Sequence, residues 1–219
     1  MMDIQILSLP TCETESWLLN RHYAKRLCPI SYAFGAYRGA ELIGVVTYGV
    51  PGSPHLCRGL CGEEMAERVL ELNRLCCENS KNVASTLVGR SLRLLPKPSV
   101  VVSYADTAQG HVGYIYQATN FLYTGAATAH DCEYLINGKK VHARTLTGRG
   151  ITAPREWAKA NGIEMVQPKP KHRYVFPCGN KKQRAEIVAA LRYSLEPYPK
   201  GESRHYDVSG EVKTQMILL

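Results

Sequence analysis

The sequence predicts an α/β (α+β) protein with one mixed central sheet and helices on its faces. The chain has 219 residues, of which 45% are hydrophobic, and this is enough for a sizeable core in one domain. Stretches with the two-residue period of strands alternate with stretches of helical period. Such alternation is typical of a sheet that is covered by helices.

The first part of the chain is expected to hold a helix, a hairpin and an irregular loop. Thr11 can cap a helix that stops before Pro29. Residues 31–50 have the pattern of two strands around a turn at Arg38 and Gly39. The loop over 51–62 is rich in turn residues and fits neither period, so we expect no regular structure there.

The middle of the chain predicts strands that alternate with helices. VLELNRLCC (69–77) fits a strand, and an amphipathic helix follows and ends at Pro96. SVVVSYAD (99–106) is then a buried strand, HVGYIYQATN (111–120) a helix and FLYTG (121–125) a strand. EYLINGKKVHART has Asn-Gly at the turn of a hairpin.

The last third changes in character, and we divide the chain there into a catalytic core at 1–138 and a basic extension at 139–219, packed on the core. The extension predicts a helix at APREWAKANG, a short strand in KHRYVF, a further helix and an edge strand in VKTQMILL. Between Lys139 and Arg204 stand fifteen Lys or Arg and five Glu, against eleven basic and twelve acidic residues in 1–138. This asymmetry indicates a polyanionic partner, nucleic acid before a membrane surface. The alternative is a solvated basic face that keeps the protein soluble.

The N-terminus lacks the basic and apolar regions of a secretory signal, and no apolar run is long enough to span a bilayer. We therefore expect a soluble cytoplasmic protein, without membrane association. The eight cysteines then fit a reduced, core-filling role. His55, Cys57 and Cys61 offer a metal site as an alternative, but a second half with zinc-site spacing is missing.

The segment from Ser103 to Gly125 has too many polar and aromatic side chains for a plain core. Asp106 ends a buried strand, which suits a proton acceptor, and the alternative is a helix cap. On the preceding strand, Arg74 faces the sheet centre and calls for an anion, while Asn73 points the other way. The side chains expected to bind substrate are Ser103, Tyr104, Gln109, His111 and Tyr114.

The order of helix, hairpin and alternating strands and helices resembles that of the GNAT acyltransferases. The resemblance implies two central strands that splay apart to admit a cofactor, and it puts Tyr116 in the place of a tyrosine that protonates a departing thiol. The glycine-rich loop that cradles pyrophosphate in these enzymes is absent from CENSKNVASTL, where Asn82 and Ser85 can supplement the N–H groups of a helix start. The donor is then acetyl-coenzyme A or another acyl or glycyl donor.

Four stretches carry a closer resemblance: RHYAKR, VLELNRL, SYADTAQGHVGYIYQATNFLYTG and KHRYVF with the later YPK. In this order, over nearly all of residues 15–200, they are similar to the Mom family of phage enzymes. These convert adenine in DNA to N6-(carbamoylmethyl)adenine and so protect phage DNA from host restriction. The resemblance implies an active-site iron with His22, Tyr23, Asp106 and Tyr116 as candidate ligands. Adjacent residues such as His22 and Tyr23 need an irregular turn to point the same way.

An enzyme of this kind would flip the adenine out of double-stranded DNA into a pocket with aromatic walls. The residues expected to be catalytic are Asp106, Tyr116, His22, Tyr23, Arg74 and Asn73. The basic segment supplies the expected phosphate contacts, which are Lys139, Lys140, Arg149, Lys171, Arg173, Lys181, Lys182 and Arg184. Two alternatives remain: an acetyltransferase that acts on the amine of a small molecule or protein, and a non-catalytic DNA-binding anti-restriction protein.

Overall fold

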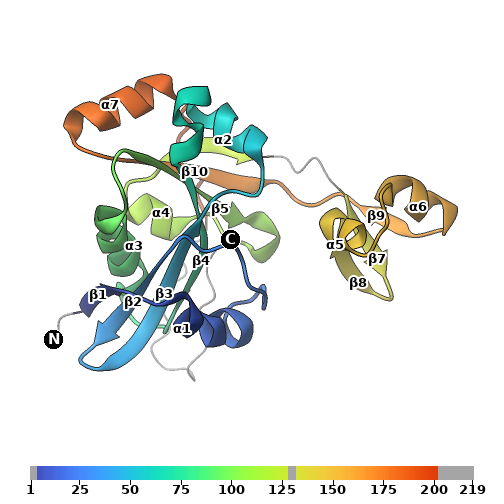
Figure 1. Ribbon diagram of the computed structural model, residues 1–219, viewed down its shortest axis with the longest axis horizontal. Coiled ribbons are helices and arrows are strands. Elements are labelled where there is room, and N and C mark those ends of the chain that lie inside the picture. The colour runs from blue at the N-terminus through green and yellow to red at the C-terminus, as the bar shows by residue number, and fades with distance from the viewer. Residues whose placement is uncertain (1–3, 128–131, 202–219) are drawn as a thin grey trace.

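The computed structural model describes residues 4–127 and 132–201, which form a large sheet and a small one (Figure 1). The large sheet has seven strands in the order β1-β2-β3-β4-β5-β10-β6. They are β1 (Ile4–Ser8), β2 (Tyr32–Arg38), β3 (Glu41–Gly49), β4 (Val69–Cys77), β5 (Ser99–Asp106), β10 (Lys171–Cys178) and β6 (Leu122–Ala127). All neighbours are antiparallel except β4 and β5, which are parallel.

The parallel pair is short, and this shapes the centre of the sheet. β4 and β5 pair only at Val69 with Val100, Leu70 with Val101 and Glu71 with Val102. Beyond these residues the two strands continue without pairing, so the sheet opens into a gap. A mixed sheet with splayed central strands between helices confirms the predicted fold class.

Helices cover both faces of the large sheet. One face packs against α3 (Val83–Leu94) and α4 (Tyr114–Ala118) in the main hydrophobic cluster. The other face packs against α2 (Pro54–Cys61) and α7 (Lys181–Ala190), and at the β1–β3 side against α1 (Thr11–Ser16) with the π-helix η1 (Trp17–Arg21). The short 3-10 helices η2 (Glu63–Arg68) and η3 (Thr107–Gln109) precede β4 and follow β5.

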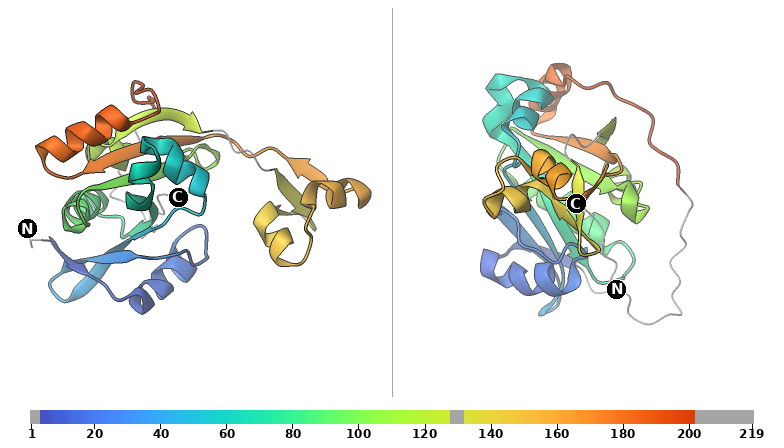
Figure 2. Two further views of the ribbon diagram at one scale, coloured as in Figure 1. Left: turned by 45° about the horizontal axis from the view of Figure 1, so that its top comes forward. Right: turned by 90° about the vertical axis from the view of Figure 1, so that its right-hand side faces the viewer.

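A small unit is inserted between β6 and β10 and projects from one side of the large sheet (Figure 2). Its sheet has the order β8-β7-β9, with helices α5 and α6. The elements are β7 (Glu133–Ile136), β8 (Lys139–His142), α5 (Ala143–Gly148), α6 (Pro154–Ala160) and β9 (Glu164–Val166). Tyr134, Leu146 and Ala158 are fully buried and make a separate hydrophobic cluster within this unit.

The structure divides the chain differently from the sequence. The expected boundary after residue 138 falls in the turn of the β7–β8 hairpin, because Asn137 and Gly138 connect these strands. The strand expected in KHRYVF is β10, which lies inside the large sheet between β5 and β6. Residues 171–190 are therefore part of the main body, and the separate unit is an insertion at 133–166.

Two further expectations change, and one lies outside the described residues. The loop over 51–62 contains α2, because Ser53 caps it through the Leu56 N–H at 3.4 Å and Pro54 begins it. The strand β1 was not predicted. The edge strand expected in VKTQMILL falls beyond residue 201. No helix in the described ranges is long and apolar enough to cross a bilayer.

After α7 the chain returns as an extended segment across β6 and α4. The Glu196 N–H donates to the Tyr123 carbonyl at 3.0 Å, and the Tyr198 hydroxyl donates to the Phe121 carbonyl at 2.6 Å. Gln117 on α4 donates to the Pro199 carbonyl at 3.3 Å. This segment therefore holds α4 against the sheet.

Candidate functional site

The gap between β4 and β5 is bridged by side chains at the point where the strands part. The Ser103 hydroxyl on β5 donates to the Leu72 carbonyl on β4 at 2.8 Å. The same hydroxyl is hydrogen-bonded to the hydroxyl of Tyr116, which comes from α4. Two polar side chains named from the sequence thus meet at the centre of the sheet.

Tyr116 is completely buried and tightly packed. Its ring centroid lies 5.0 Å from that of Phe121 and 5.0 Å from that of Tyr174. Burial raises the pKa of the Tyr116 phenol well above its usual value, and the hydrogen bond with Ser103 only partly opposes this. The phenol therefore keeps its proton at neutral pH, which suits a proton donor and not a base.

The opposite face of the sheet carries charged side chains near the point where β4 and β5 part. Ser103 and Leu72 face α3 and α4, so their strand neighbours Tyr104 and Glu71 face the other way. Asp106 lies on that side too, and its carboxylate is 3.3 Å from the Lys171 ammonium on β10. The gap thus has a tyrosine on one side and a charged cluster on the other.

Glu71, which the sequence analysis did not single out, is the central acid of this cluster. It occupies the last paired position of β4 before the gap. Burial raises the pKa of its carboxyl group above the usual value, while the positive charges of Arg74, Lys171, Arg144 and Arg26 act against that rise. Among the described residues its carboxylate makes no hydrogen bond and no ion pair within 4 Å. A half-buried carboxylate without such partners is suited to take up a proton.

Arg74 lies beside Glu71 and is 3% exposed. Its guanidinium donates to the Asn73 carbonyl at 2.6 Å, and its Nε has no hydrogen-bond partner in the described part of the chain. Burial lowers the pKa of Arg74 from its usual value. A buried guanidinium with a spare donor is suited to bind an anionic or carbonyl group.

The side chain of Asn73 has a structural role, because it holds neighbouring segments of the site in place. Thr47 pairs with Arg74 and Tyr48 with Leu72, so Asn73 is the extra residue of a β-bulge. Its side-chain Oδ1 accepts from the Thr47 hydroxyl at 2.6 Å, and its side-chain Nδ2 donates to the Pro29 carbonyl at 2.7 Å. The side chain therefore anchors the loop that follows η1, and its polar atoms are engaged.

For Asp106 the structure shows the capping role that the sequence left as an alternative. One carboxylate oxygen accepts the Ala108 N–H at 2.9 Å, and the other contacts Lys171. Both oxygens are thus engaged, in contrast to those of Glu71.

His22 and Tyr23 lie at the irregular turn that their adjacency requires. The π-helix η1 ends at Arg21, and the two rings then stack with centroids 4.6 Å apart. His22 is buried, and its Nδ1 accepts the Ala24 N–H at 3.1 Å. The Tyr23 ring is edge-on to His111, with centroids 6.3 Å apart. Three of the residues named from the sequence are therefore neighbours.

Two of the four donor groups expected to bind iron are engaged by other groups of the protein. The hydroxyl of Tyr116 is hydrogen-bonded to that of Ser103. The carboxylate of Asp106 is held by a backbone N–H and a lysine. In the described ranges no three His, Cys, Asp or Glu side chains are grouped closely enough to hold a metal.

The residues expected to bind substrate do not line one surface. Ser103 faces α4, while Tyr104 packs on the other face with the cluster of α2 and α7. Burial raises the pKa of Tyr104, and the neighbouring charge of Glu71 adds to the rise. Gln109 is exposed in η3, and Tyr114 is 46% exposed on the outer side of α4.

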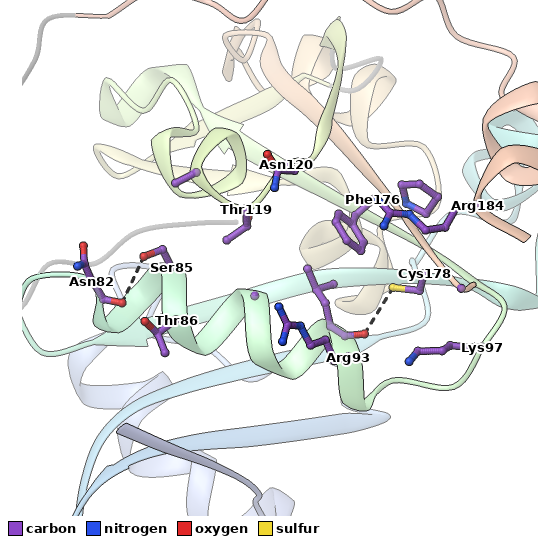
Figure 3. A pocket seen from close by; sticks show the side chains of 15 residues that line it. Asn82, Ser85, Thr86, Arg93, Lys97, Thr119, Asn120, Phe176, Cys178 and Arg184 are labelled. Carbon is purple, nitrogen blue, oxygen red and sulfur yellow. Dashed lines mark hydrogen bonds between the residues drawn. The ribbon is translucent and has the colours of Figure 1, made fainter. Parts of the chain in front are cut away.

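A groove of about 550 Å³ runs along α3 on the α4 side of the sheet (Figure 3). Asn82 and Ser85, expected to bind cofactor, line it at the first turn of α3. Asn82 precedes the helix with φ of 65° and makes no side-chain cap, so the first N–H groups of α3 are not capped by a side chain. Arg93, Lys97 and Arg184 line the rest of the groove.

The cations expected to contact DNA lie in three separate places. Lys139, Lys140 and Arg149 belong to the small unit, Lys171 and Arg173 to the start of β10, and Lys181, Lys182 and Arg184 to α7. β10 extends about 23 Å between its two ends, at about 3.3 Å per residue. Arg173 is engaged, because it donates to the Thr124 hydroxyl at 2.9 Å and stacks on Tyr193 at 3.5 Å. These cations therefore do not make one continuous patch.

The fold and the site together define a structural class of protein. Two parallel strands that part around a buried tyrosine, with helices on both faces, form a GNAT-like arrangement. The chain belongs to the Mom protein family, whose pattern matches residues 3–200. Over 195 aligned residues it is 30% identical to the methylcarbamoylase mom of Escherichia phage Mu. The aligned part covers 82% of this chain and 77% of that protein.

Two solved acetyltransferase structures are similar in outline. An acetyltransferase from Bacillus subtilis in complex with coenzyme A has a TM-score of 0.41 at 12% identity. The matched part covers 81% of this chain and 99% of the acetyltransferase chain. An agmatine N-acetyltransferase has a TM-score of 0.42 at 14% identity. The matched part covers 80% of this chain and 100% of the agmatine N-acetyltransferase chain. Scores this low have no bearing on function. The family predicted from the sequence is confirmed, and with it the expectation of an enzyme, a transferase.

Proposed function

We propose that this chain transfers a carbamoylmethyl group to N6 of adenine in double-stranded DNA. The observation that carries the proposal is the family membership over residues 3–200, together with a phage relative named as a methylcarbamoylase. The two-sided site supports it, because a transfer enzyme has to bring a donor and an acceptor to one point from different directions.

The acceptor side is the charged cluster around Glu71. The N6 amine of adenine is conjugated into the ring and is a poor nucleophile, so a base has to take its proton as the new bond forms. In this proposal Glu71 takes the proton, because its carboxylate has no hydrogen bond or ion pair within residues 4–127 and 132–201 and its pKa is raised above the usual value. Arg74 beside it orients the base or stabilises charge on the transferred group.

The donor side is the face of α3 and α4. As the bond between N6 and the transferred carbon forms, the bond from that carbon to its carrier breaks. Tyr116 donates the proton that the leaving atom of the carrier needs, and Ser103 orients the phenol. Acetyl-coenzyme A would give an acetyl product, and any acyl or glycyl carrier would likewise join N6 to a carbonyl carbon. The proposed product therefore requires a donor whose leaving group is on a CH2 carbon next to a carboxamide.

Base flipping has to deliver the adenine to this cluster, and the small unit is suited to hold the duplex beside it. Arg144 on α5 donates to the Gly52 carbonyl in the loop after β3 at 3.4 Å, and its charge acts on Glu71. Lys139 and Lys140 lie on the neighbouring strand β8. We assign phosphate contacts next to the flipped base to these three cations.

The test is the chemical content of DNA from bacteria that express the chain. Total DNA is digested to nucleosides and searched by mass spectrometry for a deoxyadenosine heavier by one carbamoylmethyl group. Glu71→Gln should abolish the product, and Glu67→Gln, an exposed acid in η2, is the matched control. Asp106→Ala should reduce the product less than Glu71→Gln, because Asp106 is engaged by Ala108 and Lys171.

A mass gain of the size of an acetyl group would show that the chain modifies DNA but uses an acetyl donor. Unmodified DNA from cells that contain the folded chain would refute the proposal in this host. Acetylation of a small amine or a protein would then support the second candidate, the acetyltransferase.

A further inference from the structure

The two helices of the small unit follow each other through a short turn with a defined backbone. Residues 149–153 join α5 to α6, and the two helices contact each other. Gly150 in this turn has a φ of 89°, and its N–H donates to the Thr147 carbonyl at 3.0 Å. The Ile151 N–H donates to the Leu146 carbonyl at 3.1 Å, so α5 ends in a Schellman motif. This arrangement is similar to that of helix-turn-helix units, whose second helix enters the major groove of DNA.

A separate core holds this pair of helices on the small sheet. Leu146 of α5 and Ala158 of α6 are buried with Tyr134 of β7. The second helix ends in the same way as the first, because Gly162 has a φ of 62° and the Ile163 N–H donates to the Ala158 carbonyl at 2.8 Å. The inner face of α6 is thus fixed on the core, and its outer face is held in a defined orientation.

The outer face of α6 carries side chains that can distinguish bases. Arg155, Glu156 and Lys159 are exposed and share one side of the helix, whereas Trp157 and Ala158 belong to the core. Arginine and lysine donate to O6 and N7 of guanine in the major groove, and a carboxylate accepts from N4 of cytosine. Glu156 forms no ion pair with a described residue, so its carboxylate is available for such a contact. Phosphate binding alone would require cations and no acid.

The charge and the place of the unit favour DNA as its partner. Residues 143–160 contain four basic residues and one acid, all of them exposed. As described above, Arg144 of α5 contacts the loop after β3, and its charge acts on Glu71. α6 packs on β9, whose last residue Val166 is at most about 18 Å from Lys171, because only four residues separate them. A duplex with its adenine at Glu71 therefore passes α6 within about one turn of DNA, which is about 34 Å.

We propose that α6 reads the base sequence beside the target adenine from the major groove, and that Arg155, Glu156 and Lys159 determine this sequence context. The inference rests on the proposed function, because it takes duplex DNA with its adenine at the Glu71 cluster as the substrate. The dimensions agree with it: an α-helix with its side chains is about 10–12 Å in diameter, and the major groove is about 12 Å wide. The seven residues of α6 extend about 10 Å, which is enough to contact about three base pairs.

Binding is tested on the purified full chain with a pool of short duplexes in which the positions around one adenine are randomised. The bound duplexes are sequenced for the unchanged chain and for Arg155→Ala, Glu156→Ala and Lys159→Ala. The control pair Lys139→Ala with Lys140→Ala removes two exposed cations from β8 of the same unit, to which phosphate contacts are assigned. Far-ultraviolet circular dichroism checks that each variant is folded.

We expect the unchanged chain to enrich particular bases beside the adenine. Each α6 variant should lower the enrichment at one position by about fivefold or more, as the loss of a base contact does, and leave the other positions unchanged. The control pair should weaken the binding of all sequences alike and reduce its salt dependence.

Three results would overturn the inference. They are the absence of any enrichment beside the adenine, the same pattern in the unchanged chain and all α6 variants, and an equal loss of binding to every sequence in the α6 variants. The last result would show that α6 contacts phosphates only. The assay needs no turnover, so its result stands apart from that of the nucleoside analysis.

Discussion

Tyr116→Phe separates a catalytic hydroxyl from a structural one. The change removes one buried hydroxyl and keeps the ring that packs on Phe121 and Tyr174. Ser103 retains its bond to the Leu72 carbonyl at 2.8 Å, so no donor is left unsatisfied. One neutral hydrogen bond is worth about 1 kcal/mol, and this lowers the melting temperature by about 2–4 °C in a chain of this size.

The chain offers a matched control in Tyr48. It is also completely buried, and its hydroxyl is 2.7 Å from that of Ser91, which donates to the Val88 carbonyl at 3.0 Å. Tyr48→Phe therefore breaks the same kind of tyrosine–serine–carbonyl chain at a position away from the gap. Its thermal destabilisation should equal that of Tyr116→Phe.

The two variants should differ in activity. Loss of a general acid costs about 10²–10⁴-fold in rate, so Tyr116→Phe should remove nearly all modified deoxyadenosine. Tyr48→Phe should retain it. Both melting curves and the nucleoside content are measured from the same preparations. Full activity of Tyr116→Phe, or equal losses in both variants, would refute the assignment of Tyr116 as proton donor.

Three further predictions follow from individual contacts. The pKa of Glu71 is raised in the folded chain, so between about pH 4.5 and that raised value the folded chain binds more protons than the unfolded chain. The free energy of unfolding therefore falls as the pH rises through this range, and urea titrations of Glu71→Gln should lack this fall. Gly89→Ala should raise the melting temperature, by about 1–4 °C for about 0.5–1 kcal/mol, because the new methyl group meets only Thr119 at 3.8 Å; an unchanged or lower value would contradict this. Gly52→Ala should displace Arg144, since the added carbon would lie 2.8 Å from its guanidinium, and should weaken duplex binding in anisotropy titrations; unchanged binding would exclude Arg144 from the DNA contact.

Local chemistry explains which elements could be predicted. The Asn137–Gly138 hairpin, the amphipathic helix α3 and the buried strand β5 follow from turn residues and from periodicity within each segment. The helix α2 had a local signal as well, Ser53 before Pro54, which its Gly and Pro residues outweighed. By contrast, the place of β10 depends on pairing with β6, about fifty residues earlier, and with β5, about seventy residues earlier, and its pattern does not encode that register.

The candidate site divides in the same way. Ser103, Asp106 and Tyr116 stand out because polar groups interrupt an apolar strand and helix, and Arg74 stands out on a buried strand. Glu71 has the same signal, an acid within VLELNRLCC, yet its importance depends on where β4 leaves β5, which periodicity does not reveal. The engagement of Asn73 with Pro29 and of Arg173 with Thr124 likewise depends on distant segments.

The sequence by itself determined the family, the class of fold and part of the site, Ser103, Arg74 and Tyr116, because these depend on residue types in a local order. The tertiary structure decided which of these side chains are engaged, on which face of the sheet each lies and which cations gather. Those properties arise from strand pairing and helix packing between distant segments. That the Glu71 carboxylate has no hydrogen bond or ion pair in the described part of the chain could be seen only there.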